Sequence, residues 1–146
     1  IETIGDSAFK GAAAIETLTF ADNAKLNIIG KESFSGCKKI KYVEIPNSVA
    51  RISHSAFQGC ESLVNAIIGK GLSRIDSKVF DGCKNLSIVY VNATTPPRIG
   101  SQVFDGCSES LLVYVPKSSL ERYRVMWAMY STIIIASDVD AFIIPR

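Results

Sequence analysis

The fold is decided by residues 29–46, which read IGKESFSGCKKIKYVEIP, because the same pattern returns along the whole chain. Five phenylalanines follow one another at intervals of 25, 23, 23 and 24 residues. Each has an isoleucine five positions before it and a glycine two positions after it. These columns are Ile4, Ile29, Ile52, Ile75 and Ile99; Phe9, Phe34, Phe57, Phe80 and Phe104; Gly11, Gly36, Gly59, Gly82 and Gly106. So many matching columns predict a tandem-repeat solenoid, in which each repeat forms one rung.

Each rung has two halves with different periodicities. Residues 41–45 alternate inward apolar and outward side chains, which predicts a short β-strand. In residues 56–60 the apolar positions recur at helical offsets, which predicts one helical turn that ends at Gly59. Turn-forming residues such as those at 46–48, 69–71 and 95–97 separate the halves. A unit this small needs neighbours to bury its apolar side, so we expect stacked rungs with a parallel sheet.

The repeating pattern Ile-Gly-x-x-Ala-Phe-x-Gly-Cys-x-x-Leu-x-x-Val-x-Ile-Pro resembles the BspA-like leucine-rich repeat of bacterial surface proteins. Residues 29–46 and 52–68 show it best, and the resemblance covers roughly residues 1 to 130. It implies an α/β repeat solenoid: a right-handed superhelix with a parallel sheet on the concave face and short helical turns on the convex face. It also implies export to the cell surface and an adhesive or protein-binding role. The first rung departs from the pattern, with Ala12 in place of cysteine and a longer loop at 21–28.

The chain is expected to divide into five repeats over residues 1–116 and a C-terminal cap over 117–146. Ser118-x-x-Glu121 has the form of a capping box that opens a helix. The segments 133–135 and 142–144 are candidates for a closing strand. One face of the helix should cover the open core of the last rung, as a terminal cap must; that face carries Leu120, Tyr123, Trp127 and Tyr130.

The N-terminal end has no comparable cap, since the first isoleucine of the repeat comes at Ile4. We therefore expect that further rungs precede residue 1 in the parent protein, or that another chain covers this end.

The four cysteines all occupy one column of the repeat: Cys37, Cys60, Cys83 and Cys107. The same column accepts Ala12, as expected of a slot for a small buried apolar group. No Cys-x-x-Cys pair is present, which disfavours a zinc site. Disulfides between adjacent rungs and reactive thiols stay open as less favoured alternatives.

None of the remaining polar motifs indicates a catalytic site, a metal site or a cofactor site. The single histidine, His54, falls in a variable column at a turn on the outer face, where we expect an exposed side chain without a catalytic role. The pair Asp138 and Asp140 lacks the rest of a calcium loop. Residues 69–71 lack the spacing of a phosphate-binding loop. A net charge of +2 and a single modest cluster, at Lys38, Lys39 and Lys41, disfavour nucleic-acid binding.

The outward strand positions are the most informative surface. They are threonines in the first rung and become apolar or aromatic in later rungs. In-register stacking predicts one patch, and contiguous exposed apolar area is typical of an interaction site. The candidate protein-binding residues are Tyr42, Glu44, Ile67, Ile88, Tyr90, Leu112 and Tyr114. Two alternatives stay open: β-propensity alone favours these residue types, or the C-terminal segment folds over this face.

The resulting hypothesis is a non-enzymatic, exported adhesion module. Its partner would be a protein, such as a host extracellular-matrix or mucosal protein, or a glycan. The alternative is a structural spacer that carries a different functional domain, or that associates with itself through the uncapped N-terminal rung or the tyrosine-bearing face. An enzymatic function has only the presence of thiols in its favour.

Overall fold

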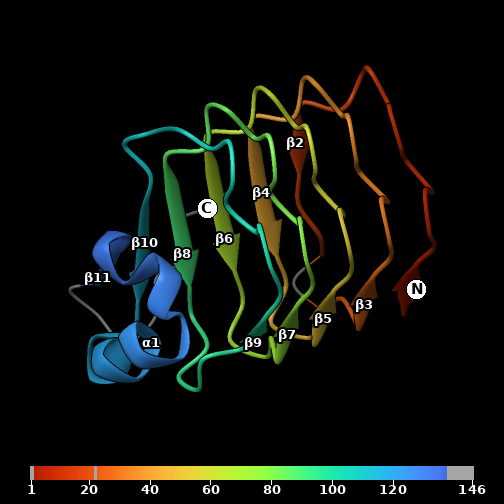
Figure 1. The fold of residues 1–146 in the computed structure, drawn as a ribbon. Coiled ribbons are helices and arrows are strands. Elements are labelled where there is room, and N and C mark those ends of the chain that lie inside the picture. Colours follow the sequence, from red (N-terminus) through yellow and green to blue (C-terminus); the bar gives the residue numbers. More distant parts are fainter. Residues whose placement is uncertain (1, 22, 138–146) are drawn as a thin grey trace.

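The computed structural model describes residues 2–21 and 23–137, and in them the rungs stack side by side into a solenoid with a helical cap at one end (Figure 1). Strands of successive rungs pair in parallel, and helices occur only in the cap within these residues. The predicted repeat solenoid with parallel strands is therefore confirmed.

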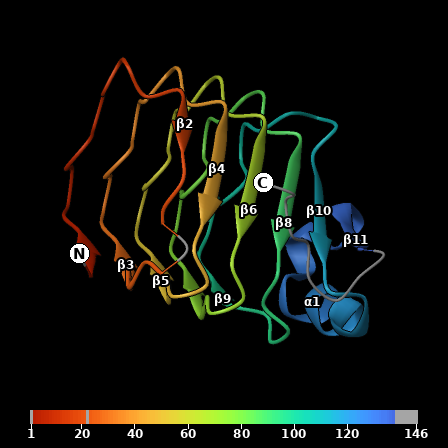
Figure 2. The same cartoon turned by 180° about the vertical axis from the view of Figure 1, so that it is seen from behind.

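The main sheet joins the strands predicted from the alternating residues, and β11 adds to its C-terminal edge. Its order is β11-β10-β8-β6-β4-β2 (Figure 2). The bounds are β2 Thr17–Leu18, β4 Tyr42–Ile45, β6 Asn65–Ile68, β8 Ile88–Val91, β10 Leu112–Val115 and β11 Ile134–Ala136.

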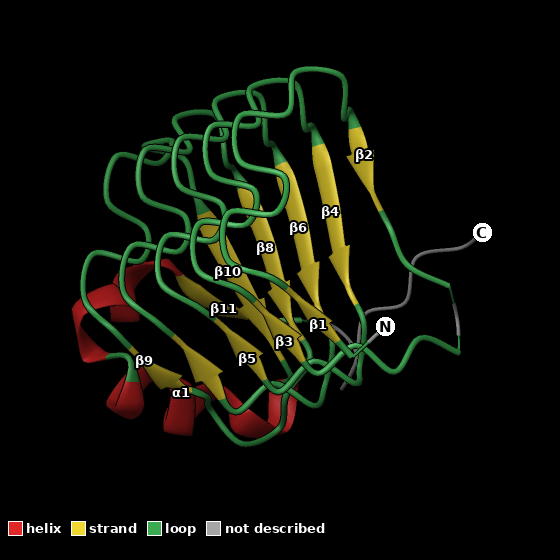
Figure 3. Cartoon of the chain, turned by 90° about the vertical axis from the view of Figure 1, so that its right-hand side faces the viewer, coloured by secondary structure: helices red, strands yellow, loops and turns green. Residues whose placement is uncertain are grey.

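A second sheet of two-residue strands forms the other wall of the solenoid and was not predicted from the sequence. It has the order β1-β3-β5-β7-β9 and is called the short sheet below (Figure 3). Its strands end on the isoleucine column: β1 Thr3–Ile4, β3 Ile28–Ile29, β5 Arg51–Ile52, β7 Arg74–Ile75 and β9 Arg98–Ile99.

The core is a continuous stack between the two sheets. The phenylalanine rings of successive rungs lie 5.3 to 5.9 Å apart and within 13° of parallel. Phe34, Phe57 and Phe80 are buried, whereas Phe9 in the first rung is 46% exposed. The inward column assignments are thus confirmed, and the core is open at the first rung.

In each rung, the segment around the repeated phenylalanine is a turn, and its backbone amides donate hydrogen bonds both within the rung and to the neighbouring rung. At Ser55 and Gly59 the backbone has φ values of 57° and 71°, in the left-handed region. The amide of Ala56 donates to Ser53 within the rung (3.1 Å), whereas the amide of Phe57 donates to Val79 of the next rung (2.9 Å). Because every fourth residue has positive φ, the segment cannot continue as an α-helix. The single helical turn predicted at 56–60 is, in detail, one step in a ladder of stacked turns.

The cap consists of η1 (Lys117–Ser119), α1 (Leu120–Met126), η2 (Ala128–Ile133) and β11. Tyr123 and Trp127 are buried against the last rung, and the Phe104 ring contacts both Trp127 and Tyr130. The Trp127 indole Nε1 donates to the Pro97 carbonyl at 2.9 Å. The predicted covering face is confirmed, while the division at residue 116 stays a proposal.

The predicted capping box at Ser118 and Glu121 is wrong. The 3₁₀ turn at 117–119 precedes the helix, so α1 begins only at Leu120 with Ser119 at its N-cap, and no side chain caps it. The Ser119 hydroxyl instead donates to the Thr94 carbonyl at 2.6 Å, because it is buried against the preceding loop.

The first candidate closing segment does form a strand. Residues 134–136 form β11, which pairs in parallel with β10. The second candidate, 142–144, and the Asp138–Asp140 motif lie outside the described residues. The α-helix α1 has seven residues, and no described helix is long and apolar enough to span a bilayer.

Candidate protein-binding surface

The outward face of the main sheet, called the strand face, brings all seven predicted residues together on neighbouring strands. Two rows run across it in register. The first row is Tyr42, Asn65, Ile88 and Leu112; the second is Glu44, Ile67, Tyr90 and Tyr114. This arrangement follows from the two-residue period of the strands, which sends alternate side chains to the same face.

The strongest feature of the strand face is a pair of stacked tyrosines. The Tyr90 and Tyr114 rings lie 5.0 Å apart at an interplanar angle of 21°. At the other side of the face, the Tyr42 hydroxyl donates to a Glu44 carboxylate oxygen at 3.0 Å. Both pairs fix the orientation of their side chains within the strand face.

The seven residues do not contribute equally to the accessible surface. Six are half-buried, but Ile67 is only 7% exposed, since it stands in register between Glu44 and Tyr90. The exposed Asn65 separates Tyr42 from Ile88 in the first row. The accessible apolar part of the strand face is therefore concentrated at the β8–β10 end: Ile88, Tyr90, Leu112 and Tyr114.

The cysteine column is structural, as predicted, and the thiols are free. Each Sγ lies 3.0 to 3.3 Å from the phenylalanine carbonyl of the preceding rung, in position to donate to it. A hydrogen bond with Cys60, together with burial, raises the pKa of Cys83, and burial raises the pKa of Cys107 to about 12. Thiols with raised pKa values are poor nucleophiles at neutral pH.

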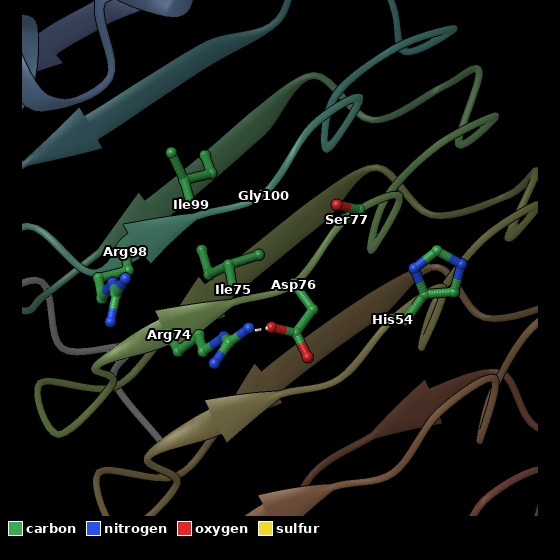
Figure 4. Close-up of a pocket in the computed structure, with 8 residues that line it drawn as sticks. All are labelled: His54, Arg74, Ile75, Asp76, Ser77, Arg98, Ile99 and Gly100. Carbon is green, nitrogen blue, oxygen red and sulfur yellow. Dashed lines mark hydrogen bonds and ion pairs between the residues drawn. The ribbon is translucent and has the colours of Figure 1, made fainter.

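A pocket that the sequence analysis missed lies on the short sheet (Figure 4). It has a volume of about 340 Å³ and is lined by His54, Arg74, Ile75, Asp76, Ser77, Arg98, Ile99 and Gly100. The sequence feature that could have indicated this pocket is the Arg-Ile pair that recurs at residues 51–52, 74–75 and 98–99.

His54 differs from its prediction, because it is half-buried at the edge of this pocket rather than exposed. Within residues 2–21 and 23–137, no group of three His, Cys, Asp or Glu side chains could hold a metal ion.

The chain matches one known repeat family and is similar to solved structures of bacterial repeat proteins. The family model described as the BspA type leucine rich repeat region matches residues 1–124 in six copies. A T. pallidum leucine-rich repeat protein of known structure is 28% identical with a TM-score of 0.71, over 80% of this chain and 53% of its own. A Bacteroides ovatus leucine-rich repeat protein is 27% identical with a TM-score of 0.57, over 93% and 40%. A comparison with curated proteins found no match.

Proposed function

Because the chain belongs to the BspA-type leucine-rich repeat family, we propose that it is a non-enzymatic module that binds another protein through its strand face. Leucine-rich repeat proteins are generally protein-interaction modules, and the solved relatives share the repeat fold. The chain spans about half of the T. pallidum protein and less of the Bacteroides protein.

The observation that carries the proposal is the in-register alignment of large side chains at the β8–β10 end of the strand face. The Tyr90–Tyr114 stack lies beside Ile88 and Leu112, which pair with each other across the same two strands. Tyrosine is enriched among the residues that dominate binding energy, and a stacked pair offers a rigid contact surface. A row of partly exposed apolar and aromatic side chains of this kind suits a protein surface better than a small molecule.

The proposed setting is the bacterial cell surface, with an adhesive role. The family is typically surface-associated in bacteria, and that membership supports the setting. The partner class we propose is a host extracellular-matrix or mucosal protein, and a glycan partner is an outcome that the experiment below distinguishes.

The experiment measures binding of the chain to immobilised matrix and mucosal proteins, with and without enzymatic removal of their glycans. The Tyr90→Ala/Tyr114→Ala double variant should weaken binding about thirtyfold, which corresponds to about 2 kcal/mol. The control is Thr17→Ala/Thr19→Ala, which changes exposed residues of the first rung and should bind as wild type. Unchanged binding by the tyrosine variant would remove the site assignment, and loss of binding after deglycosylation would replace the protein partner with a glycan.

A second candidate, a spacer that associates with itself, is supported by the exposed phenylalanine ring of the first rung. Phe9 is 46% exposed, and within the described residues its ring stacks only on Phe34. The same preparations distinguish the two candidates by sedimentation velocity. A clean monomer at high concentration removes the self-association version, whereas concentration-dependent association without binding to any host protein favours it.

A further inference from the structure

Three arginines stand in register across the short sheet. Arg51, Arg74 and Arg98 pair with one another along β5, β7 and β9, and each is followed by an inward isoleucine. Adjacent strands are about 4.8 Å apart, so the side chains leave the sheet close together. This set is called the arginine row.

A single buried carboxylate holds two members of the arginine row. Asp76 is 8% exposed. Its Oδ2 accepts from Arg51 Nε at 2.9 Å and from Arg51 Nη2 at 2.7 Å, and its Oδ1 accepts from Arg74 Nε at 2.6 Å. Asp76 is thus engaged through both oxygens and fixes the orientation of both guanidinium groups. Two of the three guanidinium groups share this one carboxylate, so the arginine row sets three positive charges against one negative charge.

The next rung has no aspartate at the position equivalent to Asp76. The column that holds Asp76 is occupied by Gly5, Gly30, Ser53 and Gly100 in the other rungs. Among the residues that the structure describes, the Arg98 guanidinium has no ion pair or hydrogen bond, and the Arg74 guanidinium uses only its Nε. The terminal nitrogens of Arg74 and the whole guanidinium of Arg98 are left as donors.

These unused donors line the pocket on the short sheet. Figure 4 shows Arg74 and Arg98 on neighbouring strands, with Asp76 drawn between Arg74 and His54. The Ser77 side chain and the bare backbone of Gly100 complete the polar lining. A glycine is required here, because a Cβ on Gly100 would lie 2.4 Å from the Ser77 amide nitrogen. The pocket therefore presents cationic donors beside a stretch of bare backbone at Gly100.

We propose that this pocket binds a tetrahedral oxyanion, a sulfate or phosphate group carried as a monoester on a small polar molecule. Guanidinium groups match such anions in charge and in hydrogen-bond geometry. A sulfate or phosphate group offers three or more acceptor oxygens, enough to serve Arg74 and Arg98 together, whereas a carboxylate offers two. At about 340 Å³ the pocket is in the size range of ligand sites and has room for more than the bare ion. It lies on the opposite wall from the strand face and does not depend on the proposed function.

The experiment is an NMR titration of the ¹⁵N-labelled chain at constant ionic strength, following the arginine Nε–H and Gly100 amide signals. The probes are glucose 6-sulfate, glucose 6-phosphate, inorganic sulfate, inorganic phosphate and acetate. We expect saturable shifts at Arg74, Arg98 and Gly100 with both esters, binding of each ester at least threefold tighter than its inorganic anion, and weaker binding of acetate.

Two variants test the assignment. Arg98→Gln should weaken binding of the esters at least tenfold, whereas Arg124→Gln, which changes an exposed arginine of the cap, should leave it unchanged. Circular dichroism confirms that both variants are folded. The proposal is overturned by shifts that do not saturate, by wild-type affinity in Arg98→Gln, or by acetate binding as tightly as the esters. Equal affinity for ester and inorganic anion overturns the assignment to a monoester.

Discussion

At the scale of single residues, the place of a rung along the solenoid decides what a side chain contributes. The phenylalanine column shows this, since the same residue type is fully buried at Phe57 and nearly half exposed at Phe9. Phe57 stacks on Phe34 at 5.3 Å and on Phe80 at 5.7 Å, so it has an aromatic neighbour on both sides. Within the described residues, Phe9 has one such neighbour, Phe34.

Phe57→Ala should therefore lower the free energy of unfolding by about 3–5 kcal/mol, because it leaves a cavity in the middle of the stack. Phe9→Ala is the matched control and should cost much less, since its ring is already partly solvated. Urea denaturation followed by circular dichroism measures both. Equal losses for the two variants would contradict the burial gradient along the column.

At the scale of elements, the cap is attached by a few side-chain hydrogen bonds to loop carbonyls of the last rungs. The buried Tyr123 hydroxyl donates to the Ala93 carbonyl, and the Trp127 indole donates to Pro97. Both acceptors are backbone carbonyls of the loop between β8 and β9. The sheet is extended at the same end by β11 on β10.

Tyr123→Phe should destabilise the cap by about 1–3 kcal/mol, because it leaves the Ala93 carbonyl buried without its donor. Hydrogen exchange should speed up first in α1 and β11, before the central rungs. Tyr130→Phe is the control, since that half-buried hydroxyl accepts a long bond of 3.4 Å from the Phe104 amide and is not a donor to a buried carbonyl among the described residues. An effect of Tyr130→Phe as large as that of Tyr123→Phe would contradict a specific contribution of the Ala93 hydrogen bond, and no loss in Tyr123→Phe would show that ring packing attaches the cap.

At the scale of the whole molecule, the thiol column couples the stability of all central rungs to pH. The pKa values of Cys37, Cys83 and Cys107 are raised above 9.0, with burial as a cause in each and the Cys60 hydrogen bond first at Cys83. In the unfolded chain these thiols lose their protons near pH 9, while the folded chain keeps them protonated. The unfolded state then binds fewer protons, so alkaline pH favours unfolding.

The free energy of unfolding should therefore be unaffected by the thiols below pH 9 and fall as the pH rises toward 12. The slope is up to about 1.4 kcal/mol per pH unit for each thiol. Urea denaturation at a series of pH values measures this fall. In Cys83→Ala the free energy of unfolding should fall less steeply with pH. The alanine is sterically tolerable because Ala12 occupies the same column in the first rung. The buried Tyr123 adds a fall of the same sign above pH 10, which the variant shares. Identical slopes in wild type and Cys83→Ala would contradict the thiol contribution.

The sequence by itself determined the rung, the inward columns, the parallel register and the residues of the strand face. It could do so because each rung repeats one local geometry and contacts only its neighbours, so aligned columns in the sequence become rows in space. Tyr90 and Tyr114 are adjacent in the fold for this reason.

Only the tertiary structure decided the short sheet, the start of α1, the burial of Ile67 and the pocket. Two-residue strands are too short to show a period, and Leu120 begins its helix where Ser119 is drawn to Thr94 of an earlier loop. Arg51 and Asp76 are 25 residues apart and become partners only when two rungs stack. Such contacts depend on which side chain a neighbouring rung presents, and the repeat pattern leaves those outward positions variable.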